Sequence, residues 1–232
     1  MPGSALSAPA SPVTRRSPAG AAGVLLALLV VALAGRLVFA LWEPPFDGSV
    51  RYDDVRGLEG AYWPVNLFLG GPAYAVSFVA TALSLVLLGR GRGAPWTLAG
   101  ALLVGLGGVL FSLAVTAEAL PFAYAADPAV LPEADGRALV DTLNDSLGPL
   151  VAVIVASQVT IAVGAVAGLV GVLLGRAAPR WFPVAGLAYV LVFVVVPVQE
   201  LGRPAVLADY VLQLLLLGGI GWFAFARTRR EA

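Results

Sequence analysis

The chain has 232 residues, of which 59% are hydrophobic and only 12% are charged, and its formal net charge is zero. A soluble domain carries about a quarter of its residues as charges, so most of this surface is expected to face lipid. Cysteine, histidine and lysine are absent, which excludes disulfides and Schiff-base lysines and removes the usual zinc and haem ligands. A chain without net charge has no basic field for nucleic acid. The composition predicts a membrane protein that is not an enzyme and holds no metal or cofactor.

Residues 1–18 are rich in serine, proline and alanine, which predicts a disordered N-terminal segment. The first apolar stretch then runs from about 19 to 42. Ala32-Leu33-Ala34 resembles a signal-peptide cleavage site, so this stretch could be removed. The apolar character continues to Trp42, however, and that length favours a retained transmembrane helix.

Five further apolar stretches follow, each near or above the ~20 residues that cross ~30 Å of hydrocarbon. Gly70-Gly71-Pro72 interrupts the second stretch, so that crossing could begin at the proline, with the preceding residues at the interface. We predict an all-α bundle of six transmembrane helices over residues 19–226, followed by a cytoplasmic tail at 227–232. The expected spans are 19–42, 63–88, 95–120, 147–174, 181–199 and 204–226.

Arginines gather in four segments that lie on one side of the membrane under a six-helix count. They are Arg15 and Arg16, Arg90 and Arg92, Arg176 and Arg180, and Arg227, Arg229 and Arg230. The other three loops hold most of the acidic residues. Because cations near helix ends stay in the cytoplasm, both termini are expected to be cytoplasmic. All 14 basic residues are arginine, a usage typical of high-GC bacteria, which predicts a bacterial plasma membrane.

A weak internal repeat joins the two arginine-bearing turns. The segment 87–90 reads Leu-Leu-Gly-Arg, as does 173–176, and each is followed by proline and tryptophan. A duplicated helical hairpin is one interpretation. The other, slightly favoured, is that these residues mark any cytoplasmic turn at a membrane surface.

Small residues four apart recur in the fourth stretch, where they let a neighbouring helix approach closely. They form either a dimerisation face or an ordinary packing face within the bundle, and the second interpretation is favoured. The packing residues are Gly164, Gly168, Gly171 and Gly175.

Polar residues at depth are the strongest functional signal, and they lie in the outer half of the bilayer or at its centre. Arg36 lies roughly 9 Å inside the outer end of its helix at 1.5 Å per residue. It either extends to the interface or pairs with a carboxylate inside an outward-facing cleft. Amides facing lipid would be unsatisfied, so the glutamines should point inward. The candidate ligand-binding residues are Arg36, Glu118, Gln158, Glu200, Asp209 and Gln213.

Two outer loops carry further patterns. Residues 47–59 mix arginine and acid without the spacing of a cation site, which favours a solvated surface network. The loop 121–144 has an apolar period that predicts a short amphipathic helix on the outer surface. That period consists of Leu131, Ala134, Ala138, Leu139 and Leu143.

The turns Arg90–Trp96 and Arg176–Trp181, the arginine in the first stretch and the acidic outer loops together resemble uncharacterised six-helix integral membrane proteins of high-GC bacteria. The resemblance covers the chain and implies no activity. One hypothesis is that the outer cleft binds or transports a small or lipid-like ligand. The alternative is a non-catalytic subunit or scaffold that docks a membrane partner or a second copy. An enzyme would have to use carboxylates alone, and no spacing supports one.

Overall fold

The computed structural model describes residues 18–44, 49–146, 148–196 and 198–232, and every regular element within these ranges is a helix. Five of the described helices are long and apolar enough to cross a membrane, while α8, at 15 residues, is shorter. These lengths and compositions indicate a membrane protein. The elements are α1 (Pro18–Trp42), α2 (Tyr52–Arg56), α3 (Tyr62–Val65), the π-helical η1 (Asn66–Gly70), α4 (Gly71–Leu88), η2 (Gly91–Gly93), α5 (Ala94–Ala126), α6 (Glu133–Ser146), α7 (Gly148–Gly175), α8 (Trp181–Val195), η3 (Val198–Leu201) and α9 (Arg203–Glu231).

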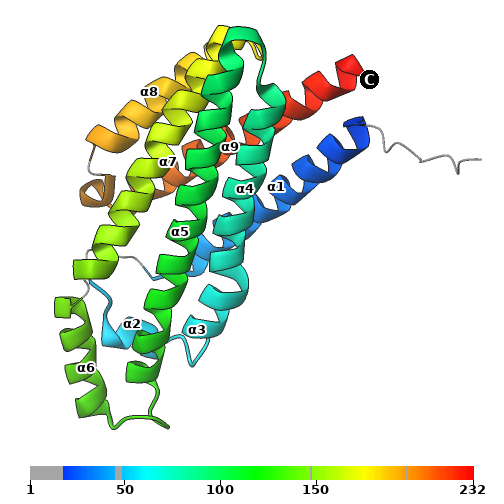
Figure 1. The fold of residues 1–232 in the computed structure, drawn as a ribbon. Helices are drawn as coiled ribbons and strands as arrows, with labels where there is room; N and C mark the ends of the chain where they lie inside the picture. The colour runs from blue at the N-terminus through cyan, green and yellow to red at the C-terminus, as the bar shows by residue number, and fades with distance from the viewer. Residues whose placement is uncertain (1–17, 45–48, 147, 197) are drawn as a thin grey trace, which may run out of the picture.

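The closest helix pair is α5 with α7, and α4 packs against α5 while α1 and α9 lie against α4 (Figure 1). Glycines permit the α5–α7 approach. A Cβ atom added to Gly100 would lie 2.4 Å from the backbone nitrogen of Gly168, and one added to Gly171 would lie 2.6 Å from the nitrogen of Thr97. The small-residue face predicted on α7 is therefore used inside the chain.

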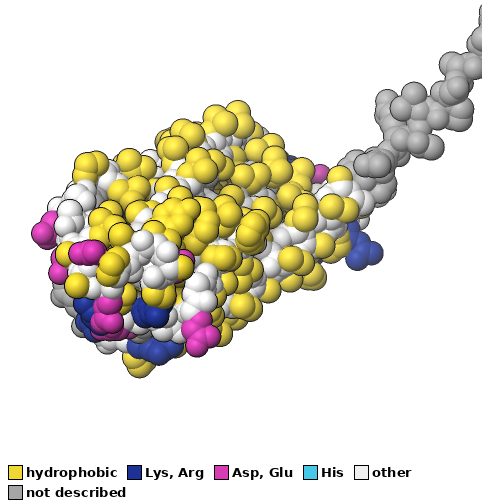
Figure 2. All heavy atoms as spheres, turned by 90° about the horizontal axis from the view of Figure 1, so that it is seen from below, with side chains coloured by type: hydrophobic (Ala, Val, Ile, Leu, Met, Phe, Trp, Pro, Cys, Tyr) yellow, Lys and Arg dark blue, Asp and Glu magenta, His cyan; other side chains and the backbone are white. Residues whose placement is uncertain are grey.

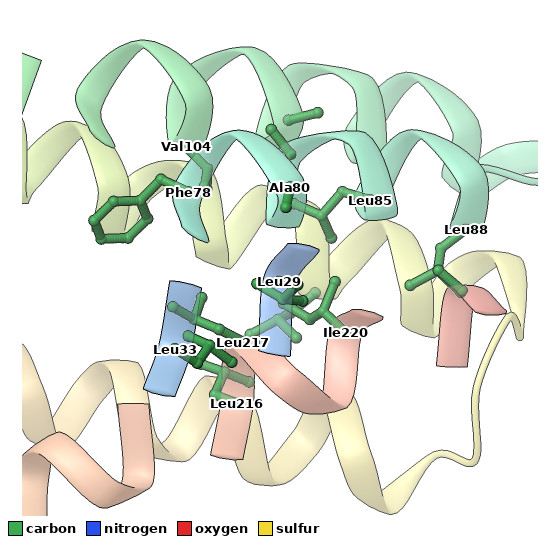
Figure 3. Packing of buried hydrophobic residues seen from close by; sticks show 14 of the residues in the cluster. Leu29, Leu33, Phe78, Ala80, Leu85, Leu88, Val104, Leu216, Leu217 and Ile220 are labelled. Atoms are coloured by element: carbon green, nitrogen blue, oxygen red, sulfur yellow. The ribbon is translucent and has the colours of Figure 1, made fainter. Parts of the chain in front are cut away.

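One apolar core joins α1, α4, α5, α7 and α9 (Figure 3). Leu29 of α1, Leu85 of α4 and Ile220 of α9 are almost completely buried in it. Large aliphatic side chains elsewhere on these helices are exposed, among them Val31, Leu102 and Leu215. Apolar residues both inside and outside are what a membrane-embedded bundle requires, because lipid replaces water as the outer solvent.

A second, smaller cluster lies at the end of the bundle that carries α2 and α6, with Phe122 and Ala125 of α5 fully buried in it. Loop residue Val50 exchanges two hydrogen bonds with the amide of Asn144 on α6, at 3.0 and 2.9 Å. Figure 2 shows charged side chains gathered on this part of the molecule and hydrophobic ones over the rest of the visible surface. We call the region that contains α2 (Tyr52–Arg56), α6 (Glu133–Ser146) and the second cluster the cap.

Arg137 is the centre of the charge network in the cap. Its guanidinium donates two hydrogen bonds to Asp53, at 3.1 and 2.6 Å, and one to Glu133 at 2.9 Å, and it lies over the ring of Tyr52. This hydrogen-bonded guanidinium lowers the pKa of the Asp53 carboxyl. Of the predicted network in residues 47–59, the structure shows Asp53 paired with Arg137 of α6, and Asp47 lies outside the described residues.

Three helices end at other residues than the apolar stretches of the sequence do. The third stretch does not stop at Leu120, because α5 continues through Pro121 to bury Phe122 in the cap cluster. The fifth stops at Val195 rather than at Gln199, and the next residue, Val196, is extended, as expected before a proline. The sixth continues to Glu231, so most of the predicted tail is helical.

The C-terminal turns of α9 are held by polar contacts to α4. Arg227 donates hydrogen bonds to the carbonyl oxygens of Leu87 and Leu88, at 3.2 and 2.9 Å, and to Glu231 at 3.0 Å. These carbonyls belong to the last turn of α4 and lack partners within their own helix, so the arginine satisfies them.

The second stretch is helical through Gly70-Gly71-Pro72 instead of interrupted there. The backbone N–H of Gly71 bonds to the carbonyl of Asn66, a five-residue spacing that widens the helix just before Pro72. A wider turn accommodates a proline, which has no N–H and would clash with the carbonyl four residues earlier. Ser112 of α5 donates a 2.6 Å hydrogen bond to the Gly71 carbonyl and fixes this turn.

The predicted amphipathic helix exists as α6, but its contact face is partly different. Gly136 and Val140 are buried, Leu139 and Leu143 are partly buried, and two of the predicted contact residues, Ala134 and Ala138, are exposed. A Cβ atom on Gly136 would lie 2.2 Å from a carbonyl oxygen of α5. The helix therefore packs on the end of α5.

The predicted disorder of residues 1–18 falls almost wholly outside the described residues.

Candidate functional site

Arg36 of α1 lies inside the bundle and has only 1% of its surface exposed. Its guanidinium donates hydrogen bonds to the amide oxygen of Gln213 on α9 and, at 3.4 Å, to the hydroxyl of Ser77 on α4. The guanidinium carbon also lies 4.4 Å from the ring centre of Tyr74 and 5.0 Å from that of Phe78. Two rings and two neutral acceptors thus surround a cation, an arrangement that stabilises it through hydrogen bonds and cation–π contacts.

No carboxylate forms an ion pair with Arg36 among the residues that the structure describes. Its Nε atom is buried and has no hydrogen-bond partner there. An ionised arginine at membrane depth costs several kcal/mol, and a buried N–H without an acceptor costs about 1–3 kcal/mol more. The site therefore has unused capacity for an anion or another acceptor.

A cavity of about 160 Å³ opens beside this guanidinium. Its wall is drawn from α1, α4, α5, α7, α8, η3 and α9, so most of the bundle converges on it. Most lining side chains are aliphatic or aromatic, and a few polar groups interrupt them. That combination is characteristic of small-molecule sites. The polar lining residues are Arg36, Tyr74, Gln158, Tyr189, Asp209, Tyr210 and Gln213.

A second polar group of the cavity centres on Asp209 of α9. Its carboxylate accepts a 2.9 Å hydrogen bond from the hydroxyl of Tyr189 on α8. The hydroxyls of Tyr74 and Tyr210 lie 3.1 Å apart and bridge α4 to α9. Within the described chain, the Gln158 amide makes no hydrogen bond and is available to a ligand.

Four of the six predicted ligand-binding residues line this one cavity: Arg36, Gln158, Asp209 and Gln213. Glu118 does not line it. The side chain of Glu200, in η3, lies outside what the structure describes. The predicted pairing of Arg36 with a carboxylate is absent within the described residues, where an amide, a hydroxyl and two rings take its place.

Glu118 belongs instead to an acidic pair with Glu43, just beyond the end of α1. Burial, and then the negative charge of Glu118, raise the pKa of Glu43 to about 7. Two neighbouring carboxylates do not make a metal site by themselves, and no group of three acidic, histidine or cysteine residues that could hold a metal occurs in the described ranges.

The tyrosines of the cavity were missed from the sequence. Tyrosine is common at membrane interfaces, where it needs no special explanation. Tyr74 and Tyr189, however, lie well inside apolar stretches, and a buried phenol requires a hydrogen-bond partner. Tyrosines at such depth are therefore the signal that would have extended the candidate list.

Comparisons with protein-family models, with curated proteins and with solved structures find no match for this chain. The cavity, the buried guanidinium on its wall and the surrounding polar groups are therefore the features that bear on function.

Proposed function

We propose that the chain is a six-crossing protein of a bacterial plasma membrane that binds or transports a small or lipid-like ligand in the Arg36 cavity, approached from the outer face. The observation that carries the proposal is a buried cation without a carboxylate partner among the described residues, on the wall of a 160 Å³ cavity. A guanidinium that served packing alone would cost more than an aliphatic side chain in the same place.

The arrangement of the arginine-bearing helix ends supports cytoplasmic termini. Glu231, near the end of α9, lies 3.8 Å from Arg90 in the α4–α5 turn. A Cβ atom on Gly175, at the end of α7, would lie 3.0 Å from the Arg90 carbonyl. The start of α1 lies at this same end of the bundle (Figure 1). The cap lies at the opposite end, which on this proposal faces outward. On this proposal the shorter helix α8 would be the sixth crossing.

The scaffold alternative has less support. The glycine face that would dock a partner is occupied within the chain by the α5–α7 contact. An enzymatic role also has little support, because the described lining of the cavity includes one carboxylate and no second acid to share acid–base work. Binding requires only the shape and polar groups that are present.

Single cysteines test access to the cavity, since the chain has no cysteine of its own. Ala165 lines the cavity from α7, whereas Val163 on the same helix is 53% exposed on the lipid-facing side. A membrane-impermeant methanethiosulfonate reagent should label Ala165→Cys in intact cells and leave Val163→Cys unmodified. Absence of labelling at Ala165→Cys would refute an outward-facing cavity.

Ligand occupancy is tested by native mass spectrometry of the protein extracted in mild detergent. The wild-type protein should release a bound small molecule on activation. Arg36→Gln should lack it, while Arg92→Gln, an exposed arginine in η2, should retain it. Equal occupancy in all three would show that the bound molecule does not use Arg36.

The orientation is tested with cysteines at Ser11, Gly91 and Ala134. Labelling of Gly91→Cys from outside would overturn it.

A further inference from the structure

Among the side chains that the structure describes, the cavity lining carries one cation, Arg36, and one carboxylate, Asp209. Arg36 forms one pole with Gln213 and Ser77, and Asp209 forms the other with Tyr189. Each charge is hydrogen-bonded to neutral groups, and no ion pair joins the two within the described residues. The described lining of the cavity therefore carries one charge of each sign.

From this dipole we infer that the ligand is a small zwitterion, in which a few atoms separate an acid anion from an ammonium group. The inference rests on the proposed binding function and adds the chemical class of the ligand. The acid anion binds where Arg36 meets the cavity, and the ammonium binds Asp209. A ligand with both charges leaves the occupied cavity neutral, which matters because an uncompensated charge in a water-poor site is costly.

Plain ions fit this cavity less well. A simple anion at Arg36 would lie beside the Asp209 carboxylate, and a simple cation at Asp209 would lie beside the guanidinium. Like charges in a low-dielectric site repel strongly, so either ion would lose much of what it gains. The zwitterion alone meets an opposite charge at each pole.

The spacing of the two poles favours a short molecule. Asp209 and Gln213 are four residues apart on α9, so their side chains start about 5–6 Å apart on one helix face. Gln213 in turn holds the guanidinium of Arg36. This arrangement favours a ligand whose two charges are a few atoms apart, as in an amino acid or an ethanolamine phosphate head group.

The volume sets the size of the molecule. An apolar cavity of about 150 Å³ accommodates benzene, so 160 Å³ suits a ligand of roughly six to nine non-hydrogen atoms. The remaining wall is apolar, with Phe111, Ile161 and Leu217 among its residues, and accommodates a short aliphatic group. The shared chemistry has two sources: a free amino acid, or the head group of a zwitterionic lipid whose tails stay in the bilayer.

Three isosteric probes separate the charge requirements: L-leucine, 4-methylpentanoate, which lacks the amine, and 3-methylbutylamine, which lacks the carboxylate. The protein is reconstituted in phosphatidylglycerol nanodiscs, and binding is measured by calorimetry and thermal stabilisation. A lipid arm replaces the free probes with phosphatidylethanolamine in the nanodisc. We expect L-leucine or phosphatidylethanolamine to bind at least tenfold more tightly than either single-charge probe, and the arm that binds identifies the source.

Variants then test each pole. Arg36→Gln and Asp209→Asn should each weaken binding of the zwitterion at least tenfold, while Asp127→Asn, an exposed acid outside the cavity, should not change it. Binding of 4-methylpentanoate equal to that of the zwitterion, with no loss in Asp209→Asn, would overturn the zwitterion and leave the proposed binding function standing. No binding in either arm, together with no molecule released in native mass spectrometry, would overturn both.

Discussion

The contact between α5 and α7 predicts that one methyl group at Gly100 will separate the two helices. A Cβ atom there would lie 2.4 Å from the nitrogen and 2.6 Å from the Cα of Gly168, and 2.6 Å from the carbonyl oxygen of Gly164. Ordinary contact begins near 3.4 Å, so relief requires a shift of roughly 1 Å, which forfeits a quarter to a half of the dispersion energy of the affected pairs. All three clashing atoms are backbone and cannot rotate away.

Overpacking of this kind costs about 1–3 kcal/mol, and the helix propensity gained on replacing glycine by alanine returns up to about 1 kcal/mol. Gly100→Ala is therefore expected to lower the free energy of unfolding by about 1–2 kcal/mol. Gly105 on the same helix is the matched control, because its added Cβ would lie 3.4 Å from the Ala82 Cβ. Gly105→Ala should leave stability unchanged or raise it by up to about 1 kcal/mol.

The assay is unfolding by dodecyl sulfate in mixed micelles, followed by far-ultraviolet circular dichroism and by tryptophan fluorescence. The chain's five tryptophans give the second signal. The two variants should differ by about 1–3 kcal/mol. Equal unfolding midpoints for Gly100→Ala and Gly105→Ala would refute the close approach of α5 to α7 at Gly100.

Three further predictions concern polar residues. Arg36→Met loses the hydrogen bond to Gln213 and two ring contacts but also removes the cost of a buried cation. The free energy of unfolding should therefore stay within about 1.5 kcal/mol of wild type in the same assay. A loss above about 3 kcal/mol would show that Arg36 serves mainly to stabilise the fold. The pKa of Glu43 is raised from 4.5 to about 7, so stability should be greatest below pH 4.5 and fall by about 3 kcal/mol as the pH rises through 7. Glu43→Gln should reduce that slope, and an unchanged slope would point to another group. Asn144→Ala removes both bonds to Val50 and should speed hydrogen exchange in the cap without changing exchange in α4, whereas unchanged exchange in the cap would contradict this anchoring role.

The sequence predicted the all-helical class because long apolar runs have few alternatives in a bilayer. It was less reliable at helix ends, where packing decides. The third apolar stretch was expected to give way to a loop at residue 121, yet the burial of Phe122 and Ala125 against the cap outweighs the cost of a proline inside α5. Neither the six-helix count nor the duplicated hairpin is tested by the structure, and both remain predictions.

The sequence predicted most of the polar residues of the candidate site but not which of them contact one another. Depth along the chain singled out Arg36, Gln158 and Gln213, because polar groups inside apolar helices need partners. Which partner each one finds depends on how the helices are rotated about their axes. Helices that are apolar on every face give no periodic signal for that rotation. The contact of Arg36 with Gln213, and the separation of Glu118 from both, therefore required the structure.

Arg36 is a residue whose burial lowers the stability of the bundle around it. Around it the bundle is well satisfied: the Ser77 hydroxyl donates to a carbonyl of its own helix, and Tyr189 donates to Asp209. Only the guanidinium Nε remains buried without an acceptor among the described side chains. A membrane bundle gains nothing in stability from such an atom, since an aliphatic side chain would fill the space at lower cost. Because conflicts of this kind concentrate at functional sites, the unpaired guanidinium and its cavity are best explained together, as a site completed by a ligand that carries the missing acceptor.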